Sequence, residues 1–319
     1  MLSRKKVKKG AFAGLALHED SLRYVELEHS SGGFNARRQE FVPLPSGCVS
    51  RESIQQFDTL EKAFNDLRSQ IGKFTCPVVL GVPARDVMLR PINYDVPPGT
   101  PMEDIEDALA LEFENYFPYP RAEAAASFAE VEAPVTAQDG EPHTTVLVAT
   151  SRLECVNKLL RAAEHADMPL GAVEPMNVAF FRAAVGRQTR NEAYLVVGVE
   201  SEVTNIILGY RDNAILFRTT LVELRNPASL DSEEALAPIV QDVQNTRTFA
   251  GNQYRGLAVQ TLILGGNLGH SPKLKALLEA WTTPNVSVAD IWSSWQIHSE
   301  LGGVPGMEAA VGLALRDMI

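Results

Sequence analysis

Two stretches of the chain open in the same way, and this repetition constrains the fold more than any other feature. Residues Ala13–His29 and Tyr194–Phe217 each read as a strand, a tight polar turn and a returning strand. Apolar runs and alternating residues on either side of a short turn are typical of a β-hairpin. More strands and helices follow each hairpin. The sequence therefore predicts an α/β protein built from two related halves around a cleft.

Composition excludes several classes of protein. Of the 319 residues, 45% are hydrophobic and 22% are charged, which is enough apolar material for packed cores. The net charge of -11 disfavours nucleic acid as the main partner, because phosphate binding requires a basic surface. No run reaches the roughly 20 apolar residues of a spanning helix. The scattered cysteines lack metal spacing and are predicted to be small core residues in a reducing cytoplasm: Cys48, Cys76 and Cys155.

The first residues of the chain depart from this acidic balance. They carry a compact basic cluster made of Arg4, Lys5, Lys6, Lys8 and Lys9. One interpretation is a solvated chain end. The other is a weak contact with anionic lipid, in which each basic residue near the surface contributes on the order of 1 kcal/mol.

The middle of the chain reads as a unit of its own. Residues 87–170 give strand, helix, strand, strand, helix, a self-sufficient α+β pattern. In the first of these helices Ile105, Leu109 and Phe113 fall on one stripe. The second helix, at 152–168, is predicted to bury the face that carries Leu153, Val156, Leu160 and Ala163.

The chain is accordingly predicted to divide into a first half at 1–86, an inserted α+β subdomain at 87–170 and a second half at 171–319. The C-terminal helix is expected to return to the first half. Helices outside the inserted subdomain are predicted at 50–72, 232–251, 271–281 and 306–319. In the third of these, Ser271 is expected to be the N-cap.

Six segments, taken in order, resemble the type IV pilus assembly protein PilM family and its actin-like relatives. They are "FAGLALHEDSLRYVEL", "VMLRPI", "EDALALEFENYFPYP", "VLVATSRLECVNKLLRAAEHADMPLGAVEP", "LILGGNLGHSPKLKALLEAW" and "GMEAAVGLALR". Each segment is weakly specific alone, and their shared order carries the resemblance. It implies an actin-like fold of duplicated ribonuclease-H-like halves, with Arg23 at the place of a lysine in the family.

The resemblance also implies a partner and a place in the cell. The partner is the short cytoplasmic tail of a PilN-like single-pass membrane protein, and other pilus platform or motor proteins are further candidates. The tail is expected in a groove between the first half and the inserted subdomain, with Val87–Ile92 and the corner at residues 116–119 as its walls. Arg90, Tyr116 and Tyr119 are expected at its rim, and Phe117 in the core. The expected location is cytoplasmic, peripheral at the inner face of the inner membrane.

The nucleotide positions depart from the family pattern. The family presents an acidic residue and a glycine in each hairpin turn, where this chain has Ala16 and His18, then Gly198 and Glu200. Ala16 and Gly198 offer no oxygen ligand to magnesium. A Glu200 carboxylate about 4 Å from a phosphate charge would be repelled by about 4 kcal/mol at an effective dielectric near 20.

The cover of the adenine base is expected to be missing as well. In the family a lid subdomain follows the third strand of the second half, whereas here Leu221 leads almost directly to a helix near Ser232. Vestiges of the nucleotide site remain at Thr204, Gly265 and Gly266, which have structural reasons to exist without a ligand. A scaffold without a cofactor, a pseudo-ATPase rather than an enzyme, is therefore predicted.

Two other functions stay open at this point. One is a working actin-like ATPase that binds ATP with magnesium through the remaining groups. The other is the cytoplasmic part of a GspL-like type II secretion platform protein, which shares the fold. Catalysis by histidine is disfavoured, and His18 in its turn is expected to be a surface imidazole.

Overall fold

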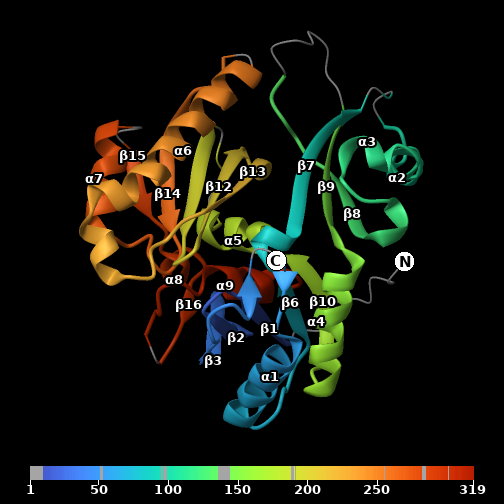
Figure 1. Cartoon of the computed structure of the whole chain (residues 1–319), viewed down its shortest axis with the longest axis vertical. Helices are drawn as coiled ribbons and strands as arrows, with labels where there is room; N and C mark the ends of the chain where they lie inside the picture. Colours follow the sequence, from blue (N-terminus) through green and yellow to red (C-terminus); the bar gives the residue numbers. More distant parts are fainter. Residues whose placement is uncertain are drawn as a thin grey trace.

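The computed structural model describes residues 10–50, 53–94, 96, 99–135, 144–187, 190, 192–254, 256–281, 285–300 and 302–319. The basic cluster at residues 4–9 lies outside this part of the chain. Two sheets with their covering helices form the body of the molecule, and a third, smaller sheet stands beside them (Figure 1).

The first sheet has the strand order β10-β6-β1-β2-β3-β16. Strands β1, β2 and β3 form an antiparallel meander, whereas β6 runs parallel to β1 and β10 runs parallel to β6. The bounds are β1 Ala11–Leu17, β2 Ser21–Ser30, β3 Gly33–Pro43, β6 Val78–Val82, β10 Leu170–Pro175 and β16 Ile297–His298.

The second sheet repeats this arrangement in the order β13-β12-β11-β14-β15. Again a meander of antiparallel strands is followed by two parallel neighbours. The bounds are β11 Ala193–Val199, β12 Val203–Tyr210, β13 Asn213–Leu221, β14 Val259–Gly265 and β15 Asn285–Val288. The duplication predicted from the two hairpins is therefore confirmed, with β1–β2 and β11–β12 in equivalent places.

The predicted α+β unit is a separate small sheet of order β7-β9-β8, so β7 and β8 lie at its edges. Its strands are β7 Val87–Tyr94, β8 Ala124–Glu130 and β9 Thr144–Arg152, and its helices are α2 Met102–Leu111 and α3 Phe113–Tyr116, with short 3₁₀ turns at Ala84–Asp86 and Arg121–Glu123. The predicted stripe Ile105, Leu109 and Phe113 is buried in a core of its own, together with Phe117.

Helix α4, Leu153–His165, buries only part of the predicted face. Its buried residues are Cys155, Leu159, Ala162 and Ala163, so Ala163 is buried as predicted, while Val156 is half-buried and Leu153 and Leu160 are exposed. The reason is the position of the helix, which packs on α1, Phe57–Ile71, of the first half. Small residues on the buried face let the two helices approach closely. Helix α1 itself begins after a short hairpin of β4 Val49–Ser50 and β5 Ser53–Ile54, later than predicted.

The chain crosses between the halves later than the predicted boundary at 171. Strand β10 still belongs to the first sheet, and only after helix α5, Met176–Val185, does the second sheet begin. Helix α9, Glu308–Leu315, returns as predicted and packs on β1, β2 and β6. The second half is completed by α6 Glu233–Gln253, α7 Pro272–Trp281, α8 Ile291–Ser294 and a 3₁₀ turn at Pro227–Asp231.

The structure also tests the predictions for the cap of α7, the cysteines and membrane-spanning helices. Ser271 caps α7 as predicted, because its hydroxyl accepts from the Leu274 amide at 3.3 Å. The three cysteines are buried, as predicted. In the described part of the chain, no helix combines the length and apolarity needed to cross a bilayer.

Helix α9 is held between β1 and α5 by backbone contact. A Cβ atom on Gly14 would lie 1.9 Å from the carbonyl oxygen of Ala310, and one on Gly312 would lie 1.8 Å from that of Ala179. No side chain fits at either place unless the backbone moves. The packing of α9 therefore depends on the absence of these two Cβ atoms.

We expect Gly312→Ala to lower the free energy of unfolding by about 2 kcal/mol or more, because overpacking against backbone outweighs the better helix propensity of alanine. Gly251→Ala in α6 is the matched control. Its nearest neighbour would be 3.7 Å away, so it should be neutral or slightly stabilising. Urea denaturation of both variants measures the difference, and equal stabilities would contradict the backbone contact.

Candidate functional site

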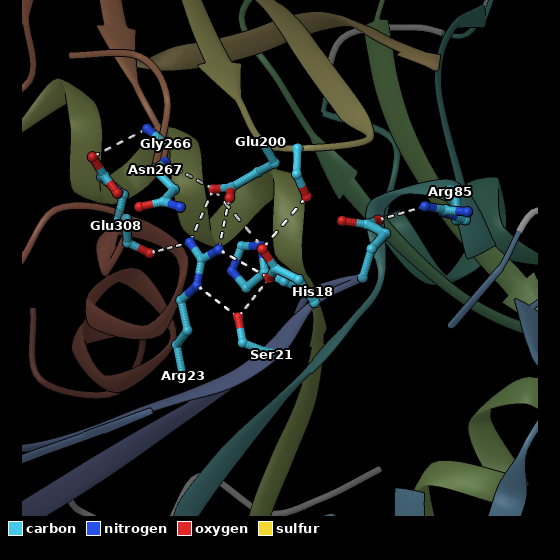
Figure 2. A network of polar contacts seen from close by, with 12 residues as sticks. His18, Ser21, Arg23, Arg85, Glu200, Gly266, Asn267 and Glu308 are labelled. Atoms are coloured by element: carbon cyan, nitrogen blue, oxygen red, sulfur yellow. Dashed lines mark hydrogen bonds and ion pairs between the residues drawn. The ribbon is translucent and has the colours of Figure 1, made fainter. Parts of the chain in front are cut away.

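The two hairpin turns meet at the junction of the two halves (Figure 2). The first turn lies between β1 and β2 and contains His18, Glu19 and Asp20. The second lies between β11 and β12 and begins at Glu200. Duplication of the fold brings them together, because the same end of each central hairpin faces the cleft.

A buried ion pair joins the two turns. Arg23, only 1% exposed, contacts the Glu200 carboxylate through both terminal nitrogens, Nη2 to Oε2 at 2.7 Å and Nη1 to Oε1 at 3.0 Å. The same guanidinium donates from Nη1 to the carbonyl of Gly306 at 2.7 Å and from Nε to Ser21 Oγ at 3.2 Å. Bidentate geometry of this kind is the strongest form of the arginine–carboxylate contact. We call Arg23 and Glu200 the clasp.

The surroundings tune the charges of the clasp. Burial raises the pKa of the Glu200 carboxyl, and the Arg23 guanidinium opposes this rise. Burial also lowers the pKa of His18, with Arg23 adding to the effect, so the imidazole is neutral near pH 7. Its Nδ1 lies 3.7 Å from Glu200 Oε1. The prediction of a surface imidazole was wrong, because the second half covers His18.

The glycine turn after β14 is engaged by the same network. The Asn267 amide donates to Glu200 Oε1 at 3.2 Å, and the Gly266 amide donates to Glu308 Oε1 of α9 at 3.1 Å. Burial raises the pKa of Glu308 to about 7. Gly266 has φ +84°, a conformation that favours glycine. Two carboxyl groups of the chain thus accept hydrogen bonds from the backbone amides that face the cleft.

Little space is left between the turns. The cavity there measures about 30 Å³ and is lined by residues of both halves, among them Leu17, His18, Gly198, Glu200 and Asn205. A volume of this size holds about one water molecule, whereas small-molecule sites typically measure roughly 300–1,000 Å³. A Cβ on Gly198 would lie 2.7 Å from the Phe180 ring. Ala16 and Thr204 are buried, and the Thr204 hydroxyl has no partner in the described structure.

A second ion cluster connects the turns to the inserted subdomain. Arg85, in the linker between β6 and β7, contacts Glu19 of the first turn at 2.8 Å and Glu202 of the second turn at 3.9 Å. Arg225 also pairs with Glu202. Sequence reasoning missed this cluster, because its members lie far apart in the chain. Among the residues that the structure describes, no group of three side chains is arranged to hold a metal ion.

The predicted rim residues lie in two different environments. Arg90 is exposed on β7 and donates from Nη1 to the backbone oxygen of Tyr116 at 2.6 Å. The Tyr116 hydroxyl lies 3.5 Å from Glu112. Tyr119, however, is only 7% exposed, and its hydroxyl donates to Thr150 at 3.3 Å. Tyr119 therefore belongs to the core of the subdomain with Phe117 and does not reach a rim.

A groove runs beside Arg90, and one of its walls lies within the expected wall Val87–Ile92, whereas its other wall was not expected. It has a volume of about 450 Å³ and lies between strand β7 of the inserted subdomain and strand β13 of the second half. Residues 87–91 form one wall, and Leu216, Phe217, Thr219 and Leu221 form the other. The contribution of β13 depends on the packing of the second half, which no local pattern reveals.

Comparison with known proteins gives a consistent picture. The family model described as type IV pilus assembly protein PilM matches residues 14–219, more than half of the chain. Among solved structures, a PilM–PilN type IV pilus biogenesis complex matches with a TM-score of 0.78 at 20% identity, covering 98% of this chain and 99% of that chain.

Two more distant structures share the fold. An actin-like ATPase-fold protein of unknown function from Bacteroides thetaiotaomicron has a TM-score of 0.54 at 10% identity, covering 88% of this chain and 91% of that one. The cytoplasmic domain of EpsL, an inner membrane component of the type II secretion system of Vibrio cholerae, has a TM-score of 0.50 at 12% identity, with coverage of 97% and 94%. The fold is thus actin-like.

We expect Glu200→Gln to lower the free energy of unfolding by about 3–5 kcal/mol, because it leaves a buried guanidinium without its counter-charge. The double variant Arg23→Met, Glu200→Leu should recover most of this loss, since an apolar pair of similar volume replaces both charges. A double-mutant cycle by urea denaturation gives the coupling energy. The control is Glu279→Gln in the Lys275–Glu279 pair, 41% exposed on both sides, which should change stability by less than about 1 kcal/mol. A Glu200→Gln effect no larger than this control would contradict the clasp.

Proposed function

This chain belongs to the type IV pilus assembly protein PilM family, and from that membership we propose that it is a nucleotide-free scaffold of a pilus assembly platform. The family match supports a role in a pilus or secretion platform. We place the protein at the cytoplasmic face of the inner membrane, where it binds the cytoplasmic tail of a PilN-like membrane protein.

The clasp is the main observation that supports the loss of nucleotide binding. In an actin-like fold the two hairpin turns approach the phosphates, and here they approach each other through Arg23 and Glu200. A phosphate would have to displace Glu200 from Arg23 and compete with Glu308 for the Gly266 amide. Both carboxylates would also repel it. All of these unfavourable interactions would arise in the same small space between the turns. The hypothesis that the protein binds ATP with magnesium is therefore the weaker one.

The tail interaction rests on the relative and on the state of the inserted subdomain. The structure with a TM-score of 0.78 is named as a complex of PilM with PilN. In this chain the inserted subdomain keeps a complete core and an open edge strand, β7. A tail peptide that adds to a strand edge gains main-chain hydrogen bonds, and pockets for its side chains give specificity. The likeness to the EpsL domain concerns the fold alone and does not favour a secretion platform over a pilus.

We expect calorimetry to show no binding of ATP or ADP with magnesium at millimolar concentration. The double variant Gly198→Asp, Glu200→Gly should gain only little affinity for nucleotide. Phe180 occupies the place of the new carboxylate, and the first hairpin still carries Ala16 and His18. A nucleotide-binding actin-like ATPase serves as the positive control. A micromolar dissociation constant for the unmodified protein would contradict the proposal.

We expect the protein to bind the N-terminal cytoplasmic tail of a PilN-like protein, supplied as a labelled peptide in fluorescence anisotropy. Arg90→Ala and Tyr116→Ala should each weaken binding by roughly 1–2 kcal/mol, the range of a contact at the edge of an interface. Tyr119→Phe, which changes a buried hydroxyl, is the control and should bind normally. Absence of binding by the folded protein, checked by circular dichroism, would exclude the scaffold mechanism.

A further inference from the structure

A second buried acidic side chain, Glu308, joins the two halves beside the clasp without being part of it (Figure 2). It is the first residue of α9, the helix that covers the first sheet, and it is only 2% exposed. Its Oε1 accepts the Gly266 amide of the second half at 3.1 Å. Its Oε2 has no hydrogen-bond partner in the described structure. One carboxyl group therefore connects α9 with the turn that follows β14.

The guanidinium at the junction has no donor left for Glu308. Arginine has five N–H donors. In Arg23 they are directed to Ser21 Oγ, to both Glu200 oxygens, to the Gly306 carbonyl and, at 3.4 Å, to Asp20 Oδ1. A negative charge on Glu308 would thus be added beside Glu200 without a hydrogen bond from the cation that neutralises Glu200.

The other elements around α9 supply little positive charge. Strands β1 and β6 carry no charged side chain. Arg182 of α5 donates to the Gly312 carbonyl further along α9 and is paired with Glu174. His270, in the segment before α7, lies with Nε2 4.0 Å from Glu308 Oε1, and its side chain is 41% exposed. The charged and titratable groups at the junction are accordingly Arg23 from β2, His18 and Asp20 from the first turn, Glu200 from the second turn, and His270.

An ionised carboxylate is costly in such a place. A buried acid that lacks a counter-charge keeps its proton to a higher pH, since the neutral form loses less on leaving water. Burial raises the pKa of Glu308 to about 7, and the Glu200 carboxylate adds to this rise, whereas the backbone amides of Glu308 and Gly266 oppose it. The neutral acid keeps Oε1 as an acceptor for the Gly266 amide and adds no charge beside Glu200.

We propose that Glu308 is a proton-dependent lock between the two halves. With its proton, Glu308 ties α9 to the Gly266 turn. Without it, the carboxylate and Glu200 repel each other, and the contact between α9 and that turn loosens. The exposed side chain of His270 marks the side of the site that is open to water. The inference goes beyond the proposed function and depends neither on a partner nor on a nucleotide.

The lock makes the protein less stable as the pH rises. Because the pKa of Glu308 is raised from an ordinary value of 4.5 to about 7, the folded protein holds the proton more tightly than the unfolded chain. The stabilisation by the proton is complete below the unfolded pKa and is lost as the pH rises through the folded pKa. From roughly pH 5.5 to pH 8, linkage at this one group raises the equilibrium constant of unfolding about thirtyfold.

Glu308→Gln is the variant that tests the lock. The amide retains an oxygen that can accept from Gly266, and it cannot ionise. Urea denaturation of both proteins at roughly pH 5.5 and pH 8 should show that the stability of the variant relative to the unmodified protein increases about thirtyfold, as an equilibrium constant, toward the higher pH. Glu200 and His18 are present in both proteins, so their titration contributes to both curves. Stabilities of the two proteins that change in parallel with pH would overturn the lock.

A control and a second measurement separate Glu308 from its neighbours. His270→Asn should keep the pH dependence of the unmodified protein, and loss of it would assign the titration to the imidazole and overturn the proposal. In NMR spectra of the unmodified protein, the Gly266 amide resonance should shift with a midpoint near the pKa of about 7. A resonance that does not titrate there would contradict the lock even if Glu308→Gln does not fold. At roughly pH 8 this amide should also exchange with solvent faster than in folded Glu308→Gln, because the neutral side chain keeps the contact closed.

Discussion

The relation of the two halves depends on a pair of opposite charges that neither half could bury alone. Arg23 enters the junction from the first hairpin and Glu200 from the second, and each is almost completely removed from water. Such a pair is tolerated only when its geometry is good and its remaining hydrogen-bonding groups are satisfied. Here Gly306, Ser21 and Asn267 provide these contacts. The pair joins the two hairpin turns that face each other across the cleft of the actin-like fold.

The interface and the inserted subdomain have different characters. At the clasp, most donors and acceptors have found partners within the chain, and the remaining space is about that of one water molecule. At β7, by contrast, one edge of the strand has no partner among the described strands, and large apolar side chains such as Met88 are exposed. Arg85 belongs to both regions, because it forms an ion pair with Glu19 of the first turn and also lines the groove beside β7.

Much of the fold could be predicted because its signals are local. The hairpins, the stripe of α2 and the cap at Ser271 each depend on residues a few positions apart. Interactions between distant segments were missed. His18 was assigned to the surface because the residue that covers it, Glu200, lies in the other half and far away in the sequence. Glu200 itself was interpreted only as a group that repels phosphate. The available signal was the pairing itself: an arginine beside one duplicated turn and a glutamate in the other. The buried face of helix α4 was predicted only in part, because the helix packs on α1 of the first half as well as on β8 and β9 of its own subdomain.

The return of α9 to the first sheet has a consequence for the order of folding. Strand β1 is synthesised long before the helix that covers it together with β2 and β6, because that helix spans Glu308–Leu315. Contacts between such distant segments require closure of a very long loop, which slows folding. During synthesis the apolar face of the first sheet remains uncovered while the inserted subdomain, with its own core, is able to form. Folding of the first half is therefore completed last, although its sequence is translated first, and the nascent chain has to be protected from aggregation during this interval.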